Sequence, residues 1–194
     1  MQISEAQNRT AGELVDLIAS KLGAGRAVHS ETAIASTARL AGSLLYRSFK
    51  LNIQSAQPGT VVLSNEANEE GPQLIGIMSA MLQHFGISLN PQMLSGEQAQ
   101  RGEEPELSVL ESLALLQLEA MRIAENHGLA LKEAAAAAAM ATAFVVKECA
   151  TNLSPEVGFN IAAYSFIEGC KTVPPTIAPK LAPRAESKPW YKRW

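Results

Sequence analysis

Charged residues are scarce in this sequence. Only 18 % of the 194 residues are charged and 47 % are hydrophobic, whereas soluble domains usually carry about 25 % charged residues. Such a chain either buries its helices to an unusual degree or has an apolar face that another subunit covers. Alanine accounts for part of the hydrophobic fraction and weakens the second explanation, but we still expect self-association into a homo-oligomer.

The sequence also lacks an excess of basic residues over most of its length. The whole chain carries a net charge of −3. Residues 174–194 contain five basic residues and one acidic residue, a net +4, which leaves −7 for residues 1–173. Binding to a phosphate backbone needs a contiguous basic surface. The acidic body therefore predicts no nucleic-acid partner.

Cysteine and histidine are too few for the common disulfide and metal frameworks. The two cysteines, Cys149 and Cys170, lie 21 residues apart, whereas zinc sites use close pairs and secreted disulfide scaffolds use more cysteines. We predict that both thiols are reduced, buried and inert. The three histidines, His29, His84 and His127, lie near predicted helix ends. None belongs to a Glu-x-x-His pair, which disfavours a di-metal bundle.

Two acidic clusters are the remaining candidates for a cation site. Their six carboxylates could bind a hard cation if the clusters met in space. Each cluster, however, lies just before or within the first turn of a predicted helix, where the helix dipole stabilises negative charge by about 0.3–1 kcal/mol per group. We therefore predict no metal, cofactor or catalytic residue, and the sequence argues against an enzyme. The clusters are Glu66, Glu69 and Glu70, and Glu103, Glu104 and Glu106.

Signals for secretion and for membrane insertion are missing as well. The first residues contain no basic region followed by an apolar run, so no secretory signal is predicted. The uncharged stretch near the alanine tract, residues 134–146, is 13 residues long, and a bilayer needs about 20. We expect a cytoplasmic protein.

What the sequence does contain is helical periodicity. It predicts an all-α fold, a single compact bundle of six or seven helices over residues 1–173, followed by an extended, proline-rich tail over residues 174–194. Thr10 and Glu13 have capping-box spacing and predict the start of the first helix. Pro72 is placed in the first turn of the third helix. A short β-like run, residues 60–63, has no evident partner strand.

Two helices are expected at the centre of the bundle. The stretch from about 105 to 126 is apolar around nearly its whole circumference, and that from about 132 to 152 contains an alanine tract that lets neighbouring helices approach closely. In the second helix, Arg39, Arg47 and Lys50 are expected to face solvent. The last helix, capped by Ser154, should bury Ile167.

The C-terminal tail is the segment whose composition is hardest to explain structurally. Both tryptophans and one of the three tyrosines fall within its last five residues, where exposed apolar area would cost roughly 25 cal/mol per Å2. Aromatic and arginine side chains are frequent interface anchors. The tail could dock on the protein's own body, on a partner protein or on an anionic membrane surface. The predicted partner-binding residues are Arg184, Trp190, Tyr191, Lys192, Arg193 and Trp194.

These observations predict a protein–protein interaction protein, of the adaptor, chaperone-like or accessory-subunit type, that self-associates and uses the tail as a contact element. The alternative is an enzyme or small-ligand-binding protein with a pocket between helices. Such a pocket would be lined by the Met and Phe side chains of the third and seventh predicted helices.

Overall fold

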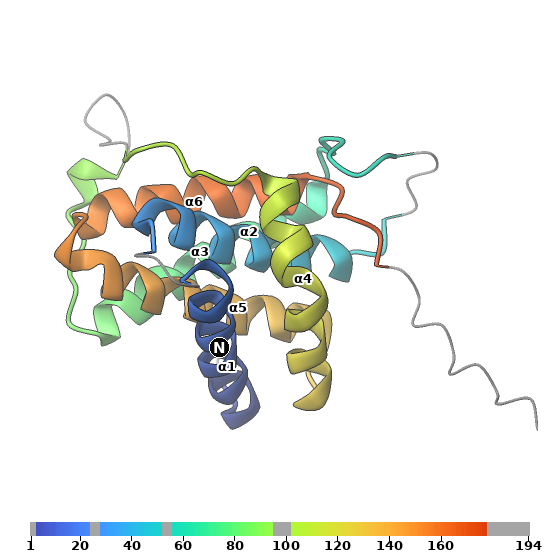
Figure 1. The fold of residues 1–194 in the computed structure, drawn as a ribbon, viewed down its shortest axis with the longest axis horizontal. Coiled ribbons are helices and arrows are strands. Elements are labelled where there is room, and N and C mark those ends of the chain that lie inside the picture. Colours follow the sequence, from blue (N-terminus) through green and yellow to red (C-terminus); the bar gives the residue numbers. More distant parts are fainter. Residues whose placement is uncertain (1–2, 24–27, 52–55, 95–101, 178–194) are drawn as a thin grey trace, which may run out of the picture.

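A computed structural model describes residues 3–23, 28–51, 56–94 and 102–177. Over these residues the chain forms six α-helices and two short 3-10 helices, which confirms the predicted all-α bundle (Figure 1). The elements in chain order are α1 (Glu5–Leu22), α2 (Ser30–Ser48), α3 (Asn65–His84), η1 (Pro91–Met93), α4 (Val109–Asn126), α5 (Leu131–Glu148), η3 (Cys149–Thr151) and α6 (Pro155–Lys171).

Two helices begin earlier than predicted, because their caps lie upstream of the residues the pattern suggested. Ser4 caps α1 and forms a capping box with Gln7, with their side chains bonded reciprocally to backbone N–H groups. Thr10 is therefore a buried residue inside α1 and not its cap. Ser64 caps α3, so Pro72 lies in the interior of that helix.

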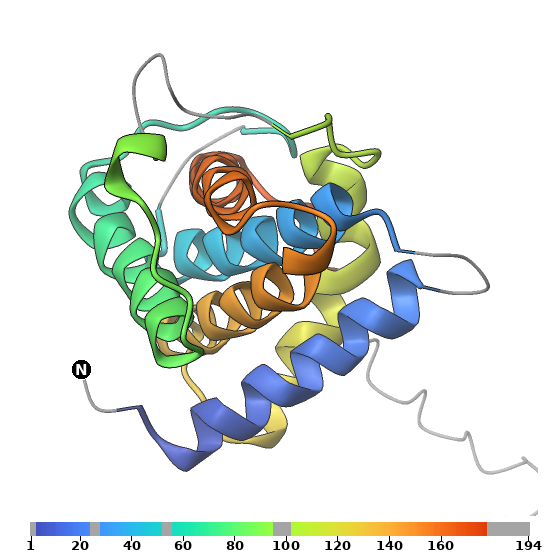
Figure 2. The ribbon, with the colours of Figure 1, turned by 90° about the vertical axis from the view of Figure 1, so that its left-hand side faces the viewer.

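The centre of the bundle is α2, which corrects the predicted arrangement. All of its residues from 31 to 46 are buried, and it packs between α6 on one side and α5 on the other (Figure 2). α3 and α4 flank this stack and α1 crosses below α5. The deep position predicted for the alanine tract is confirmed, since residues 134–143 of α5 are all buried. α4 is peripheral, and its Leu115 and Leu118 remain partly exposed.

Small residues explain why α2 takes the central place. A side chain on Gly42 of α2 would place its Cβ 2.2 Å from the carbonyl oxygen of Phe166, and one on Gly169 of α6 would place its Cβ 2.2 Å from that of Arg39. The backbones of α2 and α6 are therefore in direct contact. α4 covers the bundle with one side only, which includes Ser112, Leu113, Leu116 and Ala120.

The β-like run does have a partner. Val61 forms an isolated antiparallel bridge with Thr172, just after α6. The Val62 amide donates to the carbonyl of Lys171 at 2.7 Å, and the Val173 amide donates to that of Thr60 at 2.9 Å. This pairing fixes the chain that leads out of α6.

By length and composition, one stretch of the described chain, Leu131–Thr151, meets the criteria for a membrane-crossing helix. It is longer than the uncharged run recognised in the sequence. It coincides with the core helix α5 and η3, and 67 % of its most apolar window is buried; core helices of soluble proteins meet the same criteria.

Candidate binding groove

A groove of about 520 Å3 opens between α1, α3 and α5. α1 contributes residues from successive turns of one face, α3 contributes its C-terminal turn, and α5 contributes the half that follows the alanine tract. The lining residues are Asn8, Ala11, Gly12, Val15, Asp16, Met81, His84, Phe85, Met140, Ala141 and Phe144. Methionine and phenylalanine therefore form much of its wall.

The aromatic end of the groove is ordered by ring contacts. The rings of Phe85 and Phe144 lie 5.9 Å apart, edge to face at 81°, an arrangement that the quadrupoles of aromatic rings favour. The Lys147 ammonium lies 5.1 Å from the centre of the Phe144 ring and 5.9 Å from that of Phe85. Glu148 pairs with Lys147 at 2.7 Å, so the cation beside the rings is compensated.

Gly12 is the least expected residue of the lining. It lies in the interior of α1, where glycine costs about 0.5–1 kcal/mol relative to alanine. No heavy atom lies within 4 Å of the position that its Cβ would occupy. Close packing within the described structure therefore does not require glycine here, whereas an external group approaching the groove would benefit from it.

The polar lining residues Asn8, Asp16 and His84 are all exposed. Asp16 is exposed and is the single aspartate among the 194 residues. No ion pair reaches it from the residues that the structure describes. The groove thus combines a largely apolar lining with one exposed negative charge on α1 that no described residue pairs.

The tail residues predicted as partner-binding, Arg184, Trp190, Tyr191, Lys192, Arg193 and Trp194, lie outside the described residues. The beginning of the tail is described and is anchored. The carbonyl of Pro175 accepts hydrogen bonds from Arg47 Nη2 at 2.7 Å and from Gln117 Nε2 at 3.2 Å. Gln117 Oε1 in turn accepts from Arg47 Nε and Ser43 Oγ, both at 3.1 Å.

Of the three basic residues of α2 and its C-terminal end that were expected to face solvent, Lys50 is exposed. Arg39 and Arg47 are instead buried and half-buried, respectively. They belong to a polar stripe along α2 that is made of Thr32, Ser36, Arg39, Ser43 and Arg47 at intervals of three or four residues. The stripe faces α4 and the chain segments beside it. Burial lowers the pKa of the Arg47 guanidinium below its ordinary value.

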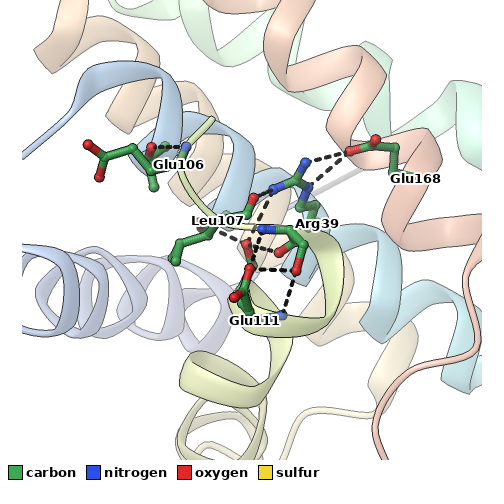
Figure 3. A network of polar contacts seen from close by, with 9 residues as sticks. Arg39, Glu106, Leu107, Glu111 and Glu168 are labelled. Carbon is green, nitrogen blue, oxygen red and sulfur yellow. Dashed lines mark hydrogen bonds and ion pairs between the residues drawn. The ribbon is translucent and has the colours of Figure 1, made fainter. Parts of the chain in front are cut away.

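Figure 3 shows the central part of this stripe. The buried Arg39 pairs with Glu168 of α6 at 2.9–3.0 Å and donates to the carbonyl of Leu107. The amide of Glu106 donates to Thr32 Oγ1 at 2.9 Å. These contacts hold the residues before α4 against α2. Because Arg39 joins α2 to α6 and to the segment before α4, we interpret the network as structural.

The other candidates from the sequence are accounted for by local structure. Glu70 pairs with Lys132 at 2.7 Å, and the amide of Glu103 donates to Glu31 at 3.3 Å. Across the described ranges, no three His, Cys, Asp or Glu side chains gather as metal ligands. His127 ends α4 and contacts Glu13 at 2.7 Å. His29, predicted to precede the cap of the second helix, is itself that cap.

The two thiols are free, with Cys170 buried and Cys149 half-buried. Burial raises the pKa of both, that of Cys170 to about 11. Since the thiolate is the reactive form, the environment of Cys170 favours the unreactive thiol. Cys149 is less enclosed than the sequence predicted.

The fold and the groove together define an all-α bundle with an open, Met- and Phe-lined surface groove. No known protein family, no curated protein and no solved structure matches this chain. The groove is therefore the feature of the molecule from which we infer a function. Its residues come from three helices separated by more than 50 positions in sequence, so no local motif reveals them.

Proposed function

We propose that this protein is a non-enzymatic interaction protein whose groove between α1, α3 and α5 binds the apolar face of an amphipathic helix from a protein partner. The observation that carries the proposal is the open groove lined by Met81, Met140, Phe85 and Phe144. Methionine side chains are flexible and polarisable and are common on surfaces that accept varied apolar partners. Helix-in-groove binding uses surfaces of this kind.

The dimensions support a short helical contact. The lining of α1 extends from Asn8 to Asp16, which corresponds to about 12 Å along the helix axis. That length matches about two turns of a partner helix, with anchors at positions such as i, i+4 and i+7. Gly12 gives the partner room for close approach at the middle of this wall.

A small apolar ligand is the second candidate. A volume of about 520 Å3 falls within the range of small-molecule sites, roughly 300–1,000 Å3. The lining agrees in part with the pocket predicted from sequence, because it includes Met and Phe of α3. The rest of the lining, however, comes from α1 and α5, and α6, the seventh predicted helix, does not contribute.

Two matched glycine variants test the site. Gly12→Leu places an apolar side chain in the groove, whereas Gly76→Leu places it on α3 at a position that is equally exposed, equally uncrowded and outside the lining. Both changes replace a poor helix former with a good one, so both variants should remain folded. The probes are a panel of fluorescein-labelled amphipathic helical peptides with Leu or Phe at i, i+4 and i+7, each with a scrambled control.

Fluorescence anisotropy should detect binding of patterned peptides, but not scrambled ones, to the wild type and to Gly76→Leu. Gly12→Leu should bind at least about tenfold more weakly, a loss of about 1.4 kcal/mol. Equal binding by both variants would remove the groove from the proposal. Binding only of a small apolar dye such as anilinonaphthalene sulfonate, blocked by Gly12→Leu, would instead support the small-ligand candidate.

A further inference from the structure

The proposed function leaves open what covers the groove when no partner is bound. We infer that the occupant is the protein's own C-terminal segment, residues 178–194, bound in the same chain, so that a partner helix must displace it. This inference rests on the proposed groove. It makes the protein self-inhibited, with the aromatic end of the chain competing for the site.

The starting point of that segment is fixed on the bundle. Pro175 is held by Arg47 of α2 and Gln117 of α4, and the described chain ends two residues later at Ile177. The anchor consists of the Pro175 carbonyl, the half-buried Arg47 side chain and the buried Gln117 side chain. The following 17 residues therefore leave from a defined point beside α4.

The segment is long enough to reach the groove. Fully extended, 17 residues span about 56–61 Å. A domain of this size has a radius of gyration of about 16 Å and hence a diameter of about 40 Å. Tethering over such a distance gives an effective concentration in the millimolar range for a flexible linker, so even a weak contact would be substantially occupied within one chain.

The chemistry of the two surfaces is complementary. Trp190, Tyr191 and Trp194 supply large apolar groups that can enter the groove, and aromatic rings contact methionine sulfur and phenylalanine edges favourably. Their basic neighbours Lys192 and Arg193 suit Asp16, the exposed carboxylate of the lining that has no ion pair among the described residues. Residues 174–194 carry +4 and the preceding residues −7, so long-range attraction acts in the same direction.

The full-length protein reports on this contact without a label. Both tryptophans of the chain are Trp190 and Trp194, so tryptophan emission reads the environment of the C-terminal segment alone. In the wild type and in Gly76→Leu, the emission should be blue-shifted and less accessible to acrylamide than in a synthetic peptide of residues 178–194. In Gly12→Leu it should shift to the red, to the position of the free peptide.

Tryptophan emission measured at several protein concentrations distinguishes docking within one chain from docking between two chains. Emission that does not change with protein concentration supports docking within the chain, whereas a red shift on dilution would show that a second copy supplies the segment and would overturn the inference. Identical emission from wild type, Gly12→Leu and the free peptide would also overturn it.

The peptide assay keeps this inference separate from the proposed function. It is repeated on the full chain with Trp190→Ser and Trp194→Ser, whose groove should be free. Tighter peptide binding by this variant than by the wild type supports displacement. Equal binding by both contradicts the inference and leaves the proposed function standing, while absence of binding to both contradicts the proposed function.

Discussion

Gly42 of α2 and Gly169 of α6 lie where two helix backbones touch, and a Cβ atom on either would lie 2.2 Å from a backbone carbonyl oxygen of the other helix. Neither contact can be relieved by turning a flexible side chain. The separation of α2 and α6, and with it the position of the central helix, therefore depends on the absence of two methyl groups.

We expect Gly42→Ala and Gly169→Ala each to lower the free energy of unfolding by about 3 kcal/mol or more, at the upper end of the range for overpacking. Urea denaturation followed by circular dichroism measures the change. Gly76→Ala is the control, since open space surrounds that position, and it should raise stability by about 0.5–1 kcal/mol. Gly42→Ala with wild-type stability would mean that the two helices are farther apart than described.

Arg39→Met should lower stability by about 2–3 kcal/mol, because it leaves the Leu107 carbonyl and Ser112 without their charged donor and Glu168 without its partner. The loss of stability should be confined mainly to the segment before α4. Amide hydrogen exchange of residues 102–108 should accelerate more than that of α5. Thr32→Val removes the hydroxyl that accepts from the Glu106 amide and contacts His29 Nδ1, but it leaves no buried charge unpaired and should have a smaller effect. Uniform acceleration across the bundle would show that the network stabilises the whole fold instead.

Alkaline pH should destabilise the protein through Cys170. Its folded pKa is raised to about 11 by burial, so between about pH 9 and 11 the unfolded thiol ionises and the folded one does not. Stability is unaffected below that window and falls across it, by about 2 kcal/mol for a shift of this size. Urea midpoints at pH 8 and pH 10.5 measure the loss. Cys170→Ala should reduce the dependence, although Cys149 and Tyr46, whose pKa values burial also raises, leave a remainder.

Self-association, expected from the low charge, is proposed to use the outer face of α6. Tyr164 is 64 % exposed there and Ile167, predicted to be buried, is 42 % exposed. If the wild type self-associates in this way, replacing both with glutamate should give a monomer in sedimentation velocity. Leu118→Glu on α4, at a comparably exposed leucine, should leave the oligomer intact. A wild type that is monomeric at all concentrations would contradict the proposal.

The periodicity of apolar residues predicted the class of fold and the depth of α5, because both depend on local pattern. The central role of α2 could not be predicted in the same way. Arg39 and Arg47 are charged, so their pattern indicates a solvated face. Their partners Leu107 and Pro175 lie 68 and 128 residues away, and only the tertiary fold brings a carbonyl group to each guanidinium.

The groove shows a similar limit. From the sequence, the Met and Phe side chains of the third predicted helix line a pocket only under the alternative hypothesis, and they are paired there with the seventh predicted helix rather than with α1 and α5. Part of the space stays open because α1 contributes the small residues Ala11 and Gly12 to the lining. An unfilled space of this kind is a property of three helices together, and helical periodicity describes one helix at a time.

The alanine tract of α5 has a thermal consequence. Alanine loses no side-chain rotamers on folding and has the highest helix propensity, so this core helix is favoured by its backbone as much as by buried surface. Each alanine also exposes little apolar area when the chain unfolds, and exposed apolar area is what raises the heat capacity. The protein should therefore have a low heat-capacity increment per residue and a stability that changes gently as it is cooled.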